Sequence, residues 1–259
     1  KAPVVGLLAQ FLVLPAATYL LTLILRPPPS VALGMILVAA CPGGNISNFV
    51  THLSRGDTAL SVTMTAISTA FAIVMTPLNI TFWGGLSPAT ASVLREVHID
   101  GLQMLGTVAV LLGVPLVVGM LVASRLPKVA AALRRPFKLL SLLFFGVFIV
   151  VAFNKNFDHF LTSIGLIFVP VLLHNALALA SGYAAARLAG PPAPQRRAVA
   201  VEVGIQNSGL GLILIFNFFD GLGGMAVIAA FWGIWHIVAG LTLATLWSRI
   251  PVADQRSMT

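Results

Sequence analysis

Residues 41–48 read Cys41-Pro42-Gly43-Gly44-Asn45-Ile46-Ser47-Asn48, and they interrupt an apolar run that extends from residue 31 to residue 54. Proline and glycine disfavour a continuous helix, so we expect the helix in this run to break near its middle. A second polar segment, within the apolar run 198–219, reads Val201-Glu202-Val203-Gly204-Ile205-Gln206-Asn207-Ser208-Gly209. Irregular backbone inside a membrane is tolerated only where protein or a water-filled cavity covers it, so both segments are candidate binding sites.

The composition places the chain in a lipid bilayer. Hydrophobic residues make up 58% of the 259 residues, charged residues make up 8%, and the mean hydropathy is +1.00. A soluble domain carries about 25% charged residues, so these few charges cannot cover a water-facing surface. Cys41 is the one cysteine, which excludes an intrachain disulfide and a cysteine-based metal cluster. Apolar runs long enough to cross a bilayer predict an all-α polytopic membrane protein with eight spans, at residues 3–25, 31–54, 57–84, 101–124, 137–154, 160–187, 198–219 and 224–247.

The basic residues are distributed unevenly between the two sides of the membrane if the spans alternate in direction. Three fall on one side, Arg26, Arg95 and Lys155. Twelve fall on the other side, which the positive-inside rule makes cytoplasmic together with the C-terminus. The net charge of +8 is therefore interpreted as a topology signal and not as a sign of nucleic-acid binding. The twelve are Lys1, Arg55, Arg125, Lys128, Arg134, Arg135, Lys138, Arg187, Arg196, Arg197, Arg249 and Arg256.

Glu202 is the one acidic residue in the interior of a predicted span, since Asp57 stands at the very start of the span 57–84. A carboxylate in hydrocarbon is costly, so it needs a cation, a proton or hydrogen-bond donors. Gln206 follows four residues later, and we expect both side chains to share one helix face. The alternative is an interfacial carboxylate that reaches the lipid headgroups, since Glu202 lies five residues after Arg197. The neighbouring amide and hydroxyl groups favour a binding site.

Two other polar features accompany the broken runs. Ser61, Thr65, Ser68 and Thr69 have the i, i+4, i+7, i+8 spacing of one helix face. A single hydroxyl in a membrane helix usually bonds to its own helix, but a stripe beside a broken span is a candidate lining of a site. Gln10 is strongly polar within the apolar run 3–25, where it serves either as a helix–helix hydrogen bond or as a ligand.

The two broken spans occupy equivalent places in the order of spans. They are the second and the seventh of the eight, and one further span follows each before a break or the end of the chain. If each is the penultimate span of one unit, the second unit holds five spans and the first shows three. We therefore expect ten spans in two inverted five-span repeats, with two spans preceding Lys1. An inverted repeat with one broken helix in each half is the architecture of secondary transporters, whose sites lie where the breaks cross.

These polar segments resemble those of the bile acid:sodium symporter family. The resemblance extends in order over essentially the whole chain, and it is carried by Pro42-Gly43-Gly44-Asn45-Ile46-Ser47-Asn48, Arg55-Gly56-Asp57-Thr58-Ala59-Leu60-Ser61, Met64-Thr65-Ala66-Ile67-Ser68-Thr69 and Glu202-Val203-Gly204-Ile205-Gln206-Asn207-Ser208-Gly209-Leu210. It implies six core helices and four panel helices. In this chain it assigns residues 1–84 to the first-repeat core helices, 85–159 to panel helices, 160–248 to the second-repeat core helices and 249–259 to a cytoplasmic tail.

The resemblance also implies two sodium sites that share Glu202. The first would use Ser47, Asn48, Ser61, Thr65 and Glu202. The second would use Gln10, Gln206, Glu202 and backbone carbonyls around Val203 and Ile205. The substrate would lie between core and panel and touch Asn45, Asn207 and His236, although His236 is equally well interpreted as a packing residue. His174 is expected to be structural.

Together these expectations predict a sodium-coupled symporter of small organic anions, bile acid-like or other carboxylates, in a bacterial inner membrane. The alternatives are a proton-coupled organic anion carrier, in which Glu202 takes a proton, and an arsenite-type carrier, which would use Cys41. An intramembrane enzyme is not favoured, because no Asp lies in the interior of a span and the sequence contains no His-Glu-x-x-His motif. The oligomeric state stays open.

Overall fold

The computed structural model describes residues 1–96, 101–155 and 157–250, so most of the predicted tail and residues 97–100 lie outside the described residues. The described elements are helices, and one isolated bridge joins two loops. In chain order they are α1 (Ala2–Leu8), η1 (Ala9–Val13), α2 (Leu14–Leu25), α3 (Pro29–Ala40), α4 (Ile46–Leu53), α5 (Thr58–Leu86), α6 (Pro88–Glu96), α7 (Gly101–Val108), η2 (Ala109–Gly113), α8 (Val114–Arg125), α9 (Pro127–Lys155), α10 (Phe157–Ala189), α11 (Ala193–Gly204), α12 (Ser208–Phe218) and α13 (Gly223–Ser248).

Five continuous helical segments within the described residues are long and apolar enough to cross a membrane. They are Ala2–Leu25, Thr58–Leu86, Leu102–Arg125, Ile167–Ala189 and Gly223–Ser248. Each coincides with a span that the apolar runs predict. The predicted span 137–154 falls within α9, and the total of eight spans stays a prediction.

Two of these segments contain a π-helical turn, and a proline explains each one. Pro15 follows η1 and Pro115 follows η2, each two residues after the last π-helical residue. Proline has no N–H to donate to the carbonyl four residues earlier. The turn before the proline can therefore widen into a π-helical turn, because the proline has no helical hydrogen bond to lose. The first of these turns carries Gln10.

The two polar segments break their helices as the sequence predicts. The first run becomes α3 and α4, and the second becomes α11 and α12. The breaks meet in an antiparallel bridge between Gly43 and Gln206. Asn207 N–H donates to the Pro42 carbonyl at 2.8 Å, and Gly44 N–H donates to the Ile205 carbonyl at 2.7 Å. Each break therefore satisfies backbone groups that the other helix leaves unpaired.

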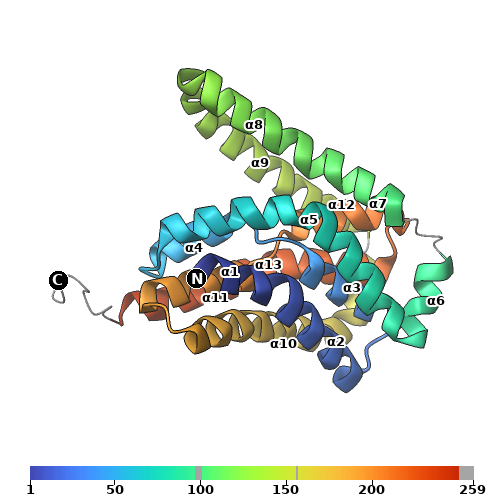
Figure 1. Cartoon of the computed structure of the whole chain (residues 1–259). Helices are drawn as coiled ribbons and strands as arrows, with labels where there is room; N and C mark the ends of the chain where they lie inside the picture. Colours follow the sequence, from blue (N-terminus) through green and yellow to red (C-terminus); the bar gives the residue numbers. More distant parts are fainter. Residues whose placement is uncertain (97–100, 156, 251–259) are drawn as a thin grey trace.

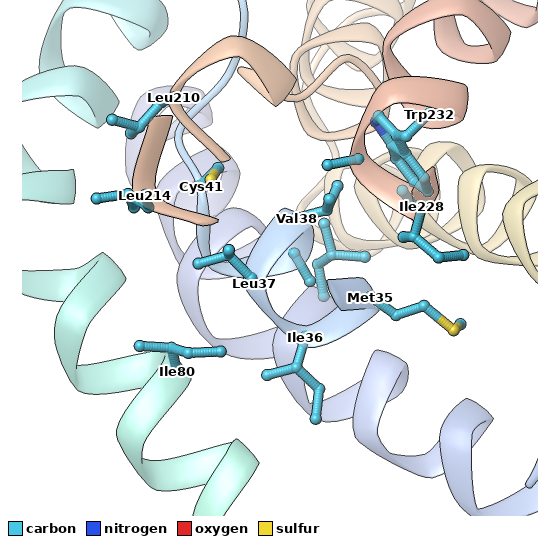
Figure 2. Packing of buried hydrophobic residues seen from close by; sticks show 14 of the residues in the cluster. Met35, Ile36, Leu37, Val38, Cys41, Ile80, Leu210, Leu214, Ile228 and Trp232 are labelled. Carbon is cyan, nitrogen blue, oxygen red and sulfur yellow. The ribbon is translucent and has the colours of Figure 1, made fainter. Parts of the chain in front are cut away.

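The helix α3 is the centre of the core. Every residue from Val31 to Ala40 is buried. Figure 2 shows its side chains packed among Ile80 of α5, Leu214 of α12 and Trp232 of α13. A helix that is apolar on all sides is expected at such a central position, because it has no face to give to water or lipid.

The pair α8 and α9 projects from the remaining helices, which pack as one bundle (Figure 1). No residue of α8 is buried. Its exposed side chains, which include Val117, Met120 and Leu121, are apolar and suit contact with lipid or with further helices. The assignment of residues 85–159 to a panel stays a prediction.

Candidate functional site

Glu202 lies buried inside the protein at the crossing of the two breaks. Its side chain is 1% exposed, on the last turn of α11. A Cβ atom built on Gly43 would lie 2.7 Å from the Cδ of Glu202, so the carboxylate rests directly against the backbone of the first break. Glycine at position 43 is what makes room for the carboxylate.

Arg197 donates to backbone carbonyls of other elements. Its guanidinium donates to the carbonyls of Ser54 at 2.7 Å, Trp247 at 3.0 Å and Ile250 at 3.1 Å. Its Cζ also lies 5.8 Å from the ring centroid of Trp247. The Ser54 and Trp247 carbonyls belong to the C-terminal ends of α4 and α13, where a cation is favourable. Arg197 therefore joins helix ends at the side of the bundle predicted to be cytoplasmic.

Three hydroxyl groups donate to the Glu202 carboxylate. Ser47 Oγ lies 2.5 Å from Oε2, Ser61 Oγ lies 3.2 Å from the same oxygen, and Thr65 Oγ1 lies 2.7 Å from Oε1. Ser47 comes from α4, whereas Ser61 and Thr65 come from α5 at the spacing of one helix face. The three donors are neutral, so they hold the carboxylate in place without cancelling its charge.

Asn48 completes the first predicted group of ligands. Its side chain is half-buried on α4, and its Oδ1 lies 3.3 Å from the Oγ1 of Thr65. The structure thus brings together Ser47, Asn48, Ser61, Thr65 and Glu202, which the family resemblance implies as one set. All five present oxygen atoms, the ligand type that hard cations prefer.

The predicted second group gathers around the end of α11. Gln10 Nε2 donates to the Cys41 carbonyl and to Gln206 Oε1, both at 2.7 Å. Gln206 Nε2 donates to the Val203 carbonyl at 2.6 Å. The Ile205 carbonyl faces the first break, where it accepts from Gly44. The two amides thus link η1 to both breaks.

The expectation that Glu202 and Gln206 share a helix face is wrong. The helix α11 ends at Gly204, and Ile205 is extended, with φ −117° and ψ 95°. Gln206 therefore lies within the bridge between the breaks, where its side chain turns back to the Val203 carbonyl. Gly204 allows this ending because glycine is a weak helix former.

Two of the predicted substrate residues begin the helices that follow the breaks. Asn45 is exposed and occupies the N-cap position of α4 without a side-chain capping bond. Asn207 is half-buried and caps α12, where its Oδ1 accepts from the Leu210 N–H at 3.0 Å. The third, His236, is buried on α13 at 3% exposure and has no hydrogen bond at Nδ1 among the described residues. A role for His236 in substrate binding stays a prediction.

His174 has the surroundings of a structural residue. Its Nε2 lies 2.8 Å from Thr18 Oγ1, and its ring centroid lies 4.4 Å from that of Trp232. These contacts link α10 to α2 and α13 within the bundle. They agree with the structural role expected for this histidine.

Three polar residues of the site region have no role in the sequence-based prediction. Thr51 Oγ1 donates to Ser61 Oγ at 3.3 Å, and Thr76 Oγ1 donates to the Ala40 carbonyl at 2.7 Å. Asn175 Nδ2 donates to the Gly204 carbonyl at 2.8 Å. Thr51 follows Ser47 by four residues, which is a usable signal for a shared helix face. Thr76 and Asn175 have no comparable signal, because their acceptors are backbone groups of other helices.

The fold and the site define a multi-pass membrane protein built on broken helices, which is the class to which many secondary transporters belong. Residues 1–163 match the model of the Sodium Bile acid symporter family. The chain belongs to this family.

The curated relatives carry transporter names. An "Uncharacterized sodium-dependent transporter YocS" of Bacillus subtilis is 36% identical over 250 residues, which cover 95% of this chain and 73% of that protein. A "Probable sodium/metabolite cotransporter BASS1, chloroplastic" of Arabidopsis thaliana is 31% identical and covers 94% of this chain and 58% of its own length. "Sodium/bile acid cotransporter 5" of Rattus norvegicus is 32% identical, with 81% and 47% covered. The chain thus spans about half to three quarters of these relatives, which are transporters and not enzymes.

Proposed function

We propose that this protein is a sodium-coupled symporter of small organic anions, bile acid-like or other carboxylates, that works by alternating access. The observation that carries the proposal is the buried carboxylate of Glu202 at the meeting point of two broken helices, where three hydroxyl groups of the described residues donate to it. A buried carboxylate of this kind is a natural binding group for a cation or a proton during the transport cycle. The names of the relatives indicate that this cation is sodium.

The first sodium ion would bind among Glu202, Ser47 and Thr65, with Ser61 and Asn48. A hydroxyl oxygen has lone pairs left after it donates its hydrogen, so it can hold a cation and keep its bond to the carboxylate. The second ion would bind beside Gln10, Gln206 and the carbonyls of Val203 and Ile205. In both positions the positive charge would offset Glu202 and order the two breaks, which favours the state that accepts substrate.

The substrate would approach the N-terminal ends of α4 and α12. These ends directly follow the two breaks and carry the positive end of the helix dipole, which favours an anionic group. Asn45 and Asn207, at the N-cap positions of these helices, would donate hydrogen bonds to a carboxylate. His236 would join them only after a movement that exposes it, since it is buried here.

We place the protein in the bacterial inner membrane, with the basic loops and the C-terminus in the cytoplasm. The support is the asymmetry of twelve basic residues against three across the predicted spans. In this arrangement the inward sodium gradient drives uptake, helped by the membrane potential at about 2.3 kcal/mol per charge per 100 mV.

The test is uptake by the full-length protein in proteoliposomes. We expect uptake of a labelled organic anion to require an inward sodium gradient and to be abolished by Glu202→Ala or Gln206→Ala. Uptake that continues without sodium and follows a proton gradient would reject the proposal and favour the proton-coupled alternative.

A further inference from the structure

Asn175 makes a buried contact with the broken helix α11. It lies on α10, its side chain is 1% exposed, and its Nδ2 donates to the Gly204 carbonyl at 2.8 Å. Gly204 is the last residue of α11, so this carbonyl has no partner within its own helix. The Oδ1 of Asn175 has no hydrogen-bond partner among the described residues. Among the described residues, the side chain of Asn175 is therefore held by its bond to the Gly204 carbonyl.

The same contact exists at the other break. Gln10 Nε2 donates to the Cys41 carbonyl at 2.7 Å. Cys41 lies two residues before Gly43, and Gly204 lies two residues before Gln206, the two residues of the bridge. In each half an amide from the preceding long helical segment thus holds the carbonyl at the same position relative to the crossing. Gln10 belongs to the proposed second sodium site, whereas Asn175 has no assigned role.

Two glycines bring α10 close enough to α11 for this short side chain to reach. A Cβ on Gly182 would lie 2.9 Å from the Val199 carbonyl oxygen and 2.9 Å from the Val203 Cβ. A Cβ on Gly204 would lie 2.5 Å from the Cγ of Leu179. Side chains at either position would separate the helices and remove the Gly204 carbonyl from the reach of Asn175.

Three successive carbonyls at the end of α11 have different partners. The Val203 carbonyl accepts from Gln206, the Gly204 carbonyl accepts from Asn175, and the Ile205 carbonyl accepts from Gly44. The donors of the outer two belong to the crossing itself. The donor to the Gly204 carbonyl belongs to α10. Asn175 therefore fixes the direction of the Gly204 carbonyl, which lies between the carbonyls of Val203 and Ile205 in the chain.

We propose that Asn175 is a positioning residue for sodium binding: it holds the Gly204 carbonyl toward α10, so that the carbonyls of Val203 and Ile205 are presented to the ion. This inference rests on the proposed function. Each of these two oxygens retains a lone pair for a cation, since each accepts one hydrogen bond in the structure. Asn175 itself does not touch the ion.

The experiment compares two buried amides in the purified full-length protein. Asn175→Leu removes the contact with Gly204 and keeps the branching of the side chain at Cγ. Asn79→Leu is the matched control, since Asn79 is 5% exposed and donates to the Met75 carbonyl within its own helix α5, at 2.9 Å. The measurement is the sodium concentration that gives half of the maximal thermal stabilisation. We expect Asn175→Leu to raise this concentration about tenfold, the loss of one ordinary hydrogen bond, and Asn79→Leu to leave it unchanged.

Asn175→Asp separates positioning from charge. This variant keeps the size of the side chain and adds a negative charge, which by attraction alone would lower the half-saturating sodium concentration. It also removes the N–H donor, so the positioning role predicts a higher concentration. A wild-type or lower value for Asn175→Asp, or equal values for the two leucine variants, would overturn the inference. A wild-type protein that shows no response to sodium would instead refute the proposed function, and the inference with it.

Discussion

Gly43→Ala tests whether the carboxylate of Glu202 must rest against the first break. The new methyl group would lie 2.7 Å from the Cδ of Glu202. Non-bonded carbon atoms need about 3.5 Å or more, so the carboxyl group must move by roughly 1 Å. A shift of this size takes the 2.7 Å bond from Thr65 beyond hydrogen-bond distance. We therefore expect Gly43→Ala to separate Glu202 from at least one of its hydroxyl donors.

The cost of this displacement sets the expected effect. One hydrogen bond to a charged group contributes about 1.5–3 kcal/mol, which corresponds to about 10- to 150-fold in sodium affinity. The assay is a sodium titration followed by thermal stability of the purified protein. Gly211→Ala is the control, because its methyl group would meet Cys41 Sγ at 3.6 Å, an ordinary contact. The reasoning is refuted if Gly43→Ala requires no more sodium than Gly211→Ala.

Three further substitutions test other parts of the account. Thr65→Val should raise the half-saturating sodium concentration by about tenfold or more, since a donor to the carboxylate is lost, whereas Thr63→Val, at an exposed position of the same helix, should match wild type. Arg197→Met should lower the free energy of unfolding by on the order of 3 kcal/mol, seen as a lower melting temperature, and an unchanged melting temperature would contradict its role at the helix ends. Cys41→Ser should leave sodium-dependent uptake intact, whereas loss of arsenite transport in this variant would favour the arsenite-type alternative.

The sequence by itself is sufficient to predict the breaks and the need of Glu202 for polar partners, because their causes are local, whereas the first group of ligands is what the family resemblance implies. Pro42 and Gly43 interrupt α3 wherever it packs, and a single carboxylate in an apolar run requires polar partners. The stripe of Ser61 and Thr65 follows from helix periodicity alone. The breaks and the stripe do not depend on which helix lies beside which, whereas the meeting of Ser47, Ser61 and Glu202 does.

The remaining features depend on tertiary packing and are not visible in the sequence. Asn175 reaches Gly204 only because Gly182 lets α10 approach α11. The position of Gln206 depends on where α11 ends, and this ending is stabilised by the bridge to Gly43. A pattern of residue types records neither the direction of a carbonyl nor the donor that it meets.

The two amide contacts support the idea of related halves without relying on sequence identity. Gln10 and Asn175 differ in length and lie in different surroundings, yet each holds the carbonyl two residues before the bridge. Backbone groups at a helix end need partners whatever the sequence. The inverted repeat itself stays a prediction.

Binding of radiolabelled sodium to the purified full-length protein tests the central claim most directly. Glu202→Gln keeps the size of the side chain and one oxygen but removes the charge. We predict saturable sodium binding to the wild-type protein and its loss in Glu202→Gln. Binding of sodium to Glu202→Gln with the affinity of the wild-type protein would contradict the account.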